Sequence, residues 1–439
     1  MSNELLQQVR LLDPLSQTDR VADVLIEAGK ISAIADAISN YPADTQIHDA
    51  QGWVLGPGLV DLYSHSGEPG FEERETLLSL MQSAAAGGFT RLAILPDTVP
   101  AMDTPTAITW LQEKWQTNLQ QIPNSKFQIP NSLPSLYPWA ALTQDIQGQK
   151  MTELAELAEL EIAGFADGHP IANLLLIRRL LEYLRPLNRP IALWPCDPQL
   201  VGNGVMREGH DSIVFGLPGI PAIAETTAIA ALLECVEEVG TPVHLMRLST
   251  ARGVELVRLA KQRGLPITAS TTWMHLLLNT ASIGSYDPSL RLNPPLGRGA
   301  DQQALLQAVK DGVVDAIAID HSPYTYEEKT VAFAEAPPGA IGLQLALPLL
   351  WQILVASGQW SALELWAALS TRPALCLSQT PASITPGQAA EMVLFNPHQS
   401  WIADSQTLKS RSMNTPWLDQ AITGQVIKLW SPIASQETG

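Results

Sequence analysis

Short apolar runs alternate with longer segments of helical periodicity across the middle of the chain, and this alternation limits the possible architectures. Eight runs have the length of buried strands: 59–63, 92–95, 139–142, 162–165, 191–194, 243–248, 267–270 and 316–320. Helical periodicity occurs at 73–86, 105–115, 152–159, 171–184, 225–239, 251–263 and 301–309, and again at 343–355 and 362–369. Parallel strands need crossover connections that are usually helices. Eight strands with following helices predict an α/β fold, a closed (β/α)8 TIM-like barrel over residues 56–384.

The two ends of the chain have a different pattern. Residues 1–55 contain short strand-like segments at 21–26, 31–34 and 53–55, which are separated by turns. Residues 385–439 contain similar segments at 391–395 and 424–429. Both ends are therefore predicted to form one composite domain, a small β domain of the sandwich type beside the barrel.

One insertion interrupts the barrel pattern between the second and third strands. The tetrapeptide IPNS occurs twice, at 122–125 and 129–132, within a region (117–135) rich in Gln, Asn, Pro and Ser. This composition is typical of an exposed loop. We interpret the segment as a surface insertion.

The net charge of the chain argues against nucleic acids and anionic membranes as partners. The 439 residues include 26 Lys and Arg against 44 Asp and Glu, a net charge of −18, and no cluster of basic residues. Nucleic acids and anionic membranes are bound through such clusters, so neither is expected. The apolar stretch 341–355 is shorter than the roughly 20 residues that span a bilayer. The N-terminus has no secretory pattern, which predicts a cytoplasmic location.

Barrel enzymes carry their chemistry at the carboxyl ends of the strands. There the chain reads DLYSHSGEPG (61–70), LPDTVP (95–100) and DHSPY (320–324), followed elsewhere by NPPL (293–296) and NTPW (414–417). This set of motifs, in this order over nearly the whole chain, resembles the dihydroorotases of the amidohydrolase superfamily. The resemblance is to the longer type that associates with aspartate transcarbamoylase.

The resemblance implies a metal-dependent barrel in which metal-bound hydroxide attacks a cyclic amide carbonyl. Asp320 is the counterpart of the general acid/base, and His65 and Asp320 are the metal-ligand positions that are retained. Asn293, Asp97 and Gly67 stand at the substrate-binding positions.

Four other ligand positions are replaced. Tyr63, Trp194 and Arg247 stand where the family has histidines, and Ala166 stands where it has a bridging aspartate, although a shift of one residue would give that role to Asp167. Arg carries a fixed positive charge and cannot ligate a metal. The metal site is therefore predicted to be eroded, and no cofactor is expected.

The substrate positions have changed as well. Gly67 replaces an arginine that binds the substrate carboxylate, and Gly297 replaces a second arginine, with Arg298 adjacent to it. Asp97 replaces an asparagine and would repel an anionic substrate. Only Asn293 is retained.

A carboxylate in a barrel mouth must be paired or neutralised. Arg247 is the obvious partner for Asp320, so the sequence predicts a buried Arg247–Asp320 ion pair in place of the metal. His65 is expected to bind one of these two residues. His244, His275 and His321 are interpreted as core or supporting histidines, and Trp194 and Trp273 as side chains that fill the vacated volume.

We therefore expect a dihydroorotase-like protein of pyrimidine biosynthesis that has lost hydrolytic activity. Its expected role is that of a structural partner of aspartate transcarbamoylase, or self-association. Two alternatives stay open at this point. One is an active amidohydrolase with zinc at a rewired site around His65, Asp320 and either His275 or His321. The other is a barrel mouth that holds a small ligand without converting it.

Overall fold

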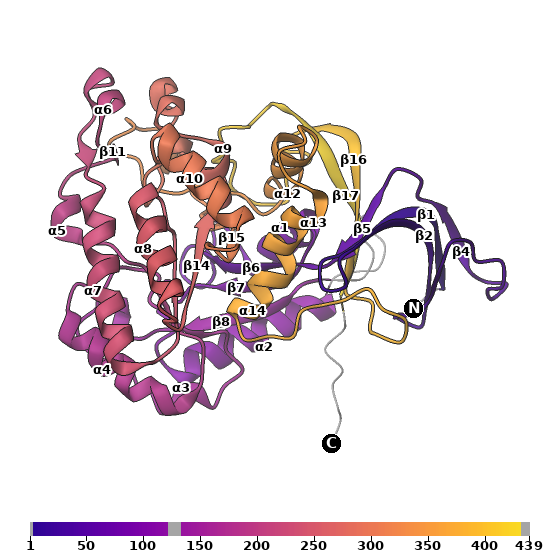
Figure 1. Cartoon of the computed structure of the whole chain (residues 1–439), viewed down its shortest axis with the longest axis horizontal. Coiled ribbons are helices and arrows are strands. Elements are labelled where there is room, and N and C mark those ends of the chain that lie inside the picture. Colours follow the sequence, from indigo (N-terminus) through magenta and orange to yellow (C-terminus); the bar gives the residue numbers. More distant parts are fainter. Residues whose placement is uncertain (1–2, 122–132, 432–439) are drawn as a thin grey trace.

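The computed structural model describes residues 3–121 and 133–431, so the repeated IPNS segments lie outside the described residues. It consists of a barrel surrounded by helices and a β sheet at one side (Figure 1). The helices of the described residues are too short or too polar to cross a lipid bilayer.

The barrel is built from two parallel four-stranded sheets with the orders β6-β7-β8-β9 and β10-β13-β14-β15. A parallel bridge from Phe165 to Ile191 joins β9 to β10, and the Asp320 amide donates to the Tyr63 carbonyl (3.1 Å) between β15 and β6. The strands are β6 (Leu59–Ser64), β7 (Phe89–Ile94), β8 (Ser135–Ala140), β9 (Gly164–Phe165), β10 (Ala192–Leu193), β13 (Val243–Leu245), β14 (Ile267–Thr272) and β15 (Ala316–Ala318). Each overlaps one of the eight predicted runs, which confirms the predicted barrel.

Helices follow the strands and cover the outside of the barrel (Figure 1). They are α1 (Leu77–Gly87), α2 (Pro105–Gln121), α3 (Leu154–Ala158), α4 (Leu174–Leu184), α5 (Pro198–Val201), α6 (His210–Val214), α7 (Ile223–Val239), α8 (Ala251–Gln262), α9 (Trp273–Leu277), α10 (Gly299–Lys310), α11 (Tyr326–Lys329), α12 (Ala346–Leu350), α13 (Ala362–Trp366) and α14 (Arg372–Cys376). A short parallel pair, β11 (Met206–Arg207) and β12 (Gly219–Ile220), lies between α5 and α7. The sequence did not predict this pair or the helices of four or five residues α5, α6, α9, α11 and α14, because elements so short show little periodicity.

The first barrel helix shows how local sequence sets an element's limits. Thr76 is the N-cap of α1: its hydroxyl accepts a hydrogen bond from the Ser79 amide, and the Ser79 side chain accepts one from the Thr76 amide. This capping box satisfies two amides that a helix start leaves free. Gly88 ends the helix in the left-handed conformation (φ 90°), which glycine adopts without steric cost.

Two layers of apolar side chains form the core of the barrel. All six residues of β6 are buried, as expected for a parallel strand covered on both faces. The inner cluster combines small residues with a few large aromatic ones, including Ala166, Tyr63, Trp139 and Trp194. The interior is therefore packed with side chains rather than open.

Strands from both ends of the chain share one seven-stranded mixed sheet, with the order β17-β16-β5-β1-β2-β3 and β4 paired with β1. The strands are β1 (Glu4–Asp13), β2 (Thr18–Glu27), β3 (Lys30–Ala35), β4 (Gln46–Asp49), β5 (Val54–Pro57), β16 (Met392–Ile402) and β17 (Ala421–Trp430). The N-terminal and C-terminal segments meet where β5 pairs with β16 in antiparallel register.

Candidate functional site

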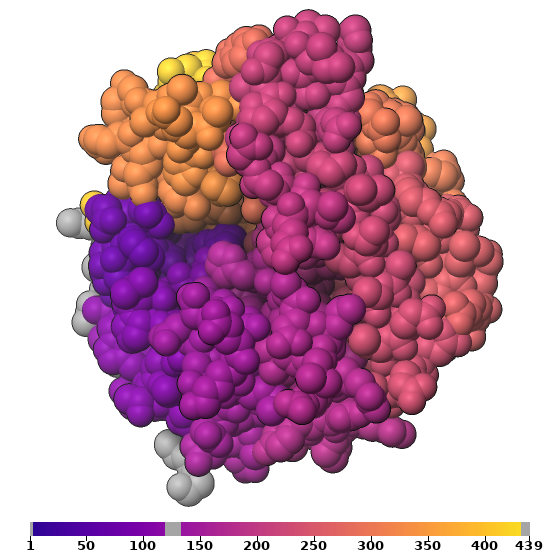
Figure 2. All heavy atoms as spheres, turned by 90° about the vertical axis from the view of Figure 1, so that its left-hand side faces the viewer, coloured from indigo at the N-terminus to yellow at the C-terminus, as the bar shows by residue number. Residues whose placement is uncertain are grey.

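The loops that follow the barrel strands carry the residues that the sequence singled out. The long connection after β10, with α5 and α6, rises at the left of Figure 1 and faces the viewer in Figure 2. On that face a hollow lies between the indigo-to-purple, magenta and orange parts of the chain (Figure 2).

Arg247 and Asp320 form a two-point ion pair at the ends of strands β13 and β15. The Arg247 Nε donates to Asp320 Oδ2 (2.9 Å), and Nη2 donates to Oδ1 (2.6 Å). The Arg247 side chain is only 4% exposed, and that of Asp320 is 14% exposed. The third guanidinium nitrogen, Nη1, donates to the Gly168 carbonyl (2.8 Å). The predicted ion pair is confirmed.

His65 extends this pair toward Asp97. Its Nδ1 lies 2.5 Å from Asp97 Oδ2, and its Nε2 lies 3.4 Å from Asp320 Oδ1 and 3.2 Å from Arg247 Nη2. The sequence predicted the contact with Asp320 or Arg247. It did not predict the contact with Asp97. The Asp97 carboxylate thus pairs with His65 inside the protein.

The charges in this group stabilise one another. Burial lowers the pKa of His65, but the Asp97 carboxylate and then Asp320 outweigh it and raise that pKa to about 9. Burial alone would raise the pKa of Asp320, yet the Arg247 guanidinium and His65 hold it well below its usual range. At neutral pH two cations and two carboxylates therefore balance.

Arg247 and Asp320 both have backbone conformations that are rare for residues with side chains. Their φ angles are 57° and 55°, in the left-handed region. Such conformations cost on the order of 1 kcal/mol each and persist where the surroundings impose them. The double hydrogen bond between the two side chains is one such constraint.

Two aromatic rings line the Arg247 side chain. The guanidinium carbon lies 4.8 Å from the centre of the Trp194 ring and 5.4 Å from that of Tyr63, at cation–π distances. The Tyr63 hydroxyl accepts from the Arg247 amide (3.1 Å) and shares a hydrogen bond with Ser270 (2.9 Å), which in turn contacts His244 Nε2 (2.8 Å). Tyr63 therefore contacts Arg247 through both its ring and its hydroxyl, and Ser270 links that hydroxyl to His244.

The residues present do not fit the binuclear metal centre that the family's motifs imply. Three of the replaced ligand positions hold a guanidinium and two aromatic rings that pack on it, and the fourth is Ala166, a buried residue of the inner cluster. Asp167 is not a substitute ligand, because its Oδ1 accepts from the Leu142 and Thr143 amides (2.8 and 3.0 Å) and its Oδ2 accepts from the Thr143 hydroxyl (2.5 Å). Within the described ranges, no group of three or more His, Cys, Asp or Glu side chains has the arrangement of a metal site.

The surroundings of Gly67, Asn293 and Arg298 show what has become of the substrate-binding positions. A side chain at Gly67 would place its Cβ 2.4 Å from the Glu75 carbonyl oxygen, so the loop has closed over the place of the missing arginine. Asn293 is exposed. Arg298, the neighbour of Gly297, points to Asp301 (3.3 Å) at the start of α10.

Two further histidines are engaged by their neighbours. His275 Nδ1 pairs with the Thr272 hydroxyl (2.7 Å), and its Nε2 faces the Pro295 carbonyl (3.3 Å). His321 Nδ1 accepts from the Gly342 amide (3.1 Å), so its Nε2 carries the hydrogen that faces Glu75 (3.2 Å). Neither ring offers a free nitrogen to a rewired site beside His65 and Asp320.

Sequence reasoning missed three contributors to this site. The Gly168 carbonyl binds Arg247, and Ser270 joins Tyr63 to His244. His169 is exposed and lies within electrostatic range of Asp97, His65 and Arg247. A backbone carbonyl and an isolated serine give no recognisable pattern in a sequence. His169, in contrast, lies two residues after Asp167 in the loop after β9, and it could have been considered.

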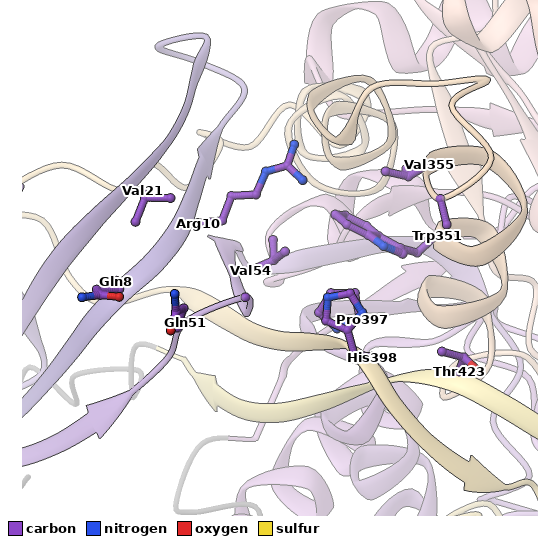
Figure 3. A pocket seen from close by; sticks show the side chains of 12 residues that line it. Gln8, Arg10, Val21, Gln51, Val54, Trp351, Val355, Pro397, His398 and Thr423 are labelled. Atoms are coloured by element: carbon purple, nitrogen blue, oxygen red, sulfur yellow. The ribbon is translucent and has the colours of Figure 1, made fainter.

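A separate cavity of about 610 Å³ lies at the junction of the terminal sheet and the helical segment after α12 (Figure 3). Its lining includes Arg10, Val54, Trp351 and His398. None of the residues of the ion-pair site lines it, and Arg10 is already paired with Asp19 (2.8 Å).

Comparison with known proteins places the chain among relatives of the same length. A family model described as dihydro-orotase-like matches residues 52–252. A probable dihydroorotase-like protein of Synechocystis sp. is 43% identical over 97% of this chain and 99% of that protein. The dihydroorotase of Syntrophus aciditrophicus is 35% identical over 96% of both chains.

Solved structures agree in fold. The L-hydantoinase of Arthrobacter aurescens superposes with a TM-score of 0.82 over 99% of this chain and 97% of that one, at 18% identity. A dihydropyrimidinase of Brevibacillus agri superposes with a TM-score of 0.78 over 98% of this chain and 94% of that one, at 19% identity. The relatives in sequence show that the chain belongs to the dihydroorotase-like family.

Proposed function

We propose that this protein is a non-catalytic dihydroorotase-like protein that serves pyrimidine biosynthesis as a structural partner of aspartate transcarbamoylase. The observation that supports the loss of catalysis is the Arg247–Asp320 ion pair, in which a ligand position of the family carries a guanidinium bound to the general acid/base position.

The ion pair affects both the nucleophile and the proton donor that hydrolysis would need. A hydroxide nucleophile at neutral pH needs a cation that lowers the pKa of a bound water. The guanidinium at this position has no coordination site for water. Asp320 binds Arg247 through both oxygens and its pKa is lowered, so it stays ionised and has no proton to give to a leaving group.

An activity assay tests this part of the proposal. The purified chain should not hydrolyse dihydroorotate above background, with or without added zinc, whereas the Syntrophus aciditrophicus dihydroorotase provides a positive control of similar length. Zinc-dependent turnover by the wild-type chain would overturn the proposal of a non-catalytic protein.

Substrate binding gives a second readout. Gly67 and Gly297 replace two guanidinium groups, and each lost charge-assisted hydrogen bond costs about 1.5–3 kcal/mol. Calorimetry should therefore show dihydroorotate binding at least about a hundredfold weaker than to the same control enzyme. Comparable affinities would show that the carboxylate is bound in another way.

The partner is proposed from the family resemblance, which covers nearly the whole chain. The purified chain and the aspartate transcarbamoylase of the same organism should co-elute in size-exclusion chromatography. Elution as a larger homo-oligomer without the transferase would favour self-association instead. The same proposal includes a cytoplasmic location. It also includes the absence of a cofactor and of nucleic-acid and membrane partners.

A further inference from the structure

We propose that Asp97, His65, Asp320 and Arg247 form a permanent hydrogen-bonded unit, here called the mouth cluster, that takes over the cross-linking role of a metal centre. The inference starts from the same ion pair as the proposed function. Its test measures unfolding rather than hydrolysis, so the two can fail separately.

The mouth cluster joins the ends of several strands that are distant in sequence. His65 follows β6, Asp97 follows β7, Arg247 follows β13 and Asp320 follows β15. Arg247 also binds the Gly168 carbonyl after β9 (2.8 Å). Five of the eight strand ends are therefore connected by side-chain hydrogen bonds, as ligands from several strands would be by a shared metal ion.

The histidine has no nitrogen left for a metal. Its Nδ1 is 2.5 Å from Asp97, and its Nε2 points at the place where Arg247 Nη2 and Asp320 Oδ1 meet, 3.2 and 3.4 Å away. A metal ion at Nε2 would have to displace the guanidinium. The retained ligand residues His65 and Asp320 thus have a new function within the cluster.

The cluster is largely buried, with side-chain exposures of 14% for Asp320, 19% for Asp97 and 23% for His65 around the buried Arg247, so its members should depend on one another. Arg247 is 4% exposed and stacks on Trp194 at 4.8 Å. A charge that loses its partner in such a place stays buried and unpaired. The exposed pair Arg10–Asp19 has the same two-point geometry, with both distances 2.8 Å, but its side chains are 41% and 31% exposed. It provides a matched control.

Double-mutant cycles on the full chain test the proposal. The first uses Arg247→Met and Asp320→Asn, the second uses His65→Gln and Asp97→Asn, and the control uses Arg10→Met and Asp19→Asn. The unfolding equilibrium constant is measured in urea, with a chelator and with added zinc. In both test cycles the double variant should differ by at least about tenfold from the product of the single effects, and the control cycle should differ by less than about threefold.

Additive effects in either test cycle would overturn the proposal. Stoichiometric zinc in the wild type, with stabilisation by zinc that a chelator removes, would overturn it as well. If Arg247→Met alone does not fold, the His65–Asp97 cycle still decides, and recovery of folding in Arg247→Met with Asp320→Asn would support the cluster.

Discussion

At the scale of single residues, the most informative substitution is Arg247. It places a fixed cation beside Asp320, and the two side chains bind at 2.6 and 2.9 Å. Both residues have a left-handed backbone, and the contact between their side chains is one constraint that holds it.

The replaced positions suggest that a metal site can be restored. A variant with Tyr63→His, Trp194→His and Arg247→His would free Asp320 and add three nitrogen ligands near His65. It should bind zinc and gain thermal stability with it, measured by metal analysis and by unfolding with and without a chelator. The wild type and Arg247→Met are the controls, and a triple variant without zinc would show that these positions do not converge as inferred.

His275 should make stability depend on pH. Burial lowers its pKa to about 4, below its usual value near 6.5, so the folded state keeps the ring neutral. This contribution is fully present above pH 6.5 and is lost as the pH falls toward 4, by about 3 kcal/mol in total. His275→Gln should show a shallower loss of stability in urea titrations between pH 7 and 4.5. Parallel curves for variant and wild type would contradict the assignment.

At the scale of elements, local signals set where helices begin and end. The hydroxyl of Thr76 and the side chain of Ser79 form the capping box at the N-terminus of α1. The predicted segment started earlier, at residue 73, because helical periodicity alone does not locate a cap.

Thr76→Ala removes one side of this capping box. It should lower the free energy of unfolding by about 1 kcal/mol, since the Ser79 amide loses its acceptor. Chemical denaturation measures the effect. Thr227→Ala, in the interior of α7, where the hydroxyl donates only to the Ile223 carbonyl, should stay within about 0.5 kcal/mol. Equal effects would mean that the cap contributes nothing specific.

At the scale of the whole molecule, the barrel and the terminal sheet are joined by a buried ion pair. Arg91 of β7 binds Glu391, the residue before β16, through Nε (2.7 Å) and Nη2 (2.8 Å), with side-chain exposures of 14% and 10%. The Thr90 hydroxyl also donates to Glu391 (2.9 Å). The two parts of the molecule should therefore unfold together.

Glu391→Ala should lower the stability by about 3 kcal/mol, because it leaves the Arg91 guanidinium buried without its partner. Thermal unfolding followed by circular dichroism measures the loss. The exposed pair Arg20–Asp36 is the control, and Asp36→Ala should change stability by less than about 0.5 kcal/mol. Separate transitions for the wild-type barrel and sheet would contradict the coupling.

The sequence by itself determined the architecture, and together with the family resemblance it predicted an eroded metal site. Strand-length apolar runs such as 191–194 are predictive because parallel strands are buried on both faces. The resemblance identified substitutions such as Tyr63 and Trp194, and the rule that a buried charge needs a partner then predicted that Arg247 would pair with Asp320.

Only the tertiary structure decided what the remaining polar groups do. Asp97 lies 32 residues from His65 in sequence, and their contact depends on how β6 and β7 end side by side. The closed loop at Gly67 depends on the backbone of Glu75, and the bond from Arg247 to Gly168 depends on a carbonyl that every residue has. Hydrogen-bond partners are set by distance and direction in space, and a linear pattern contains neither.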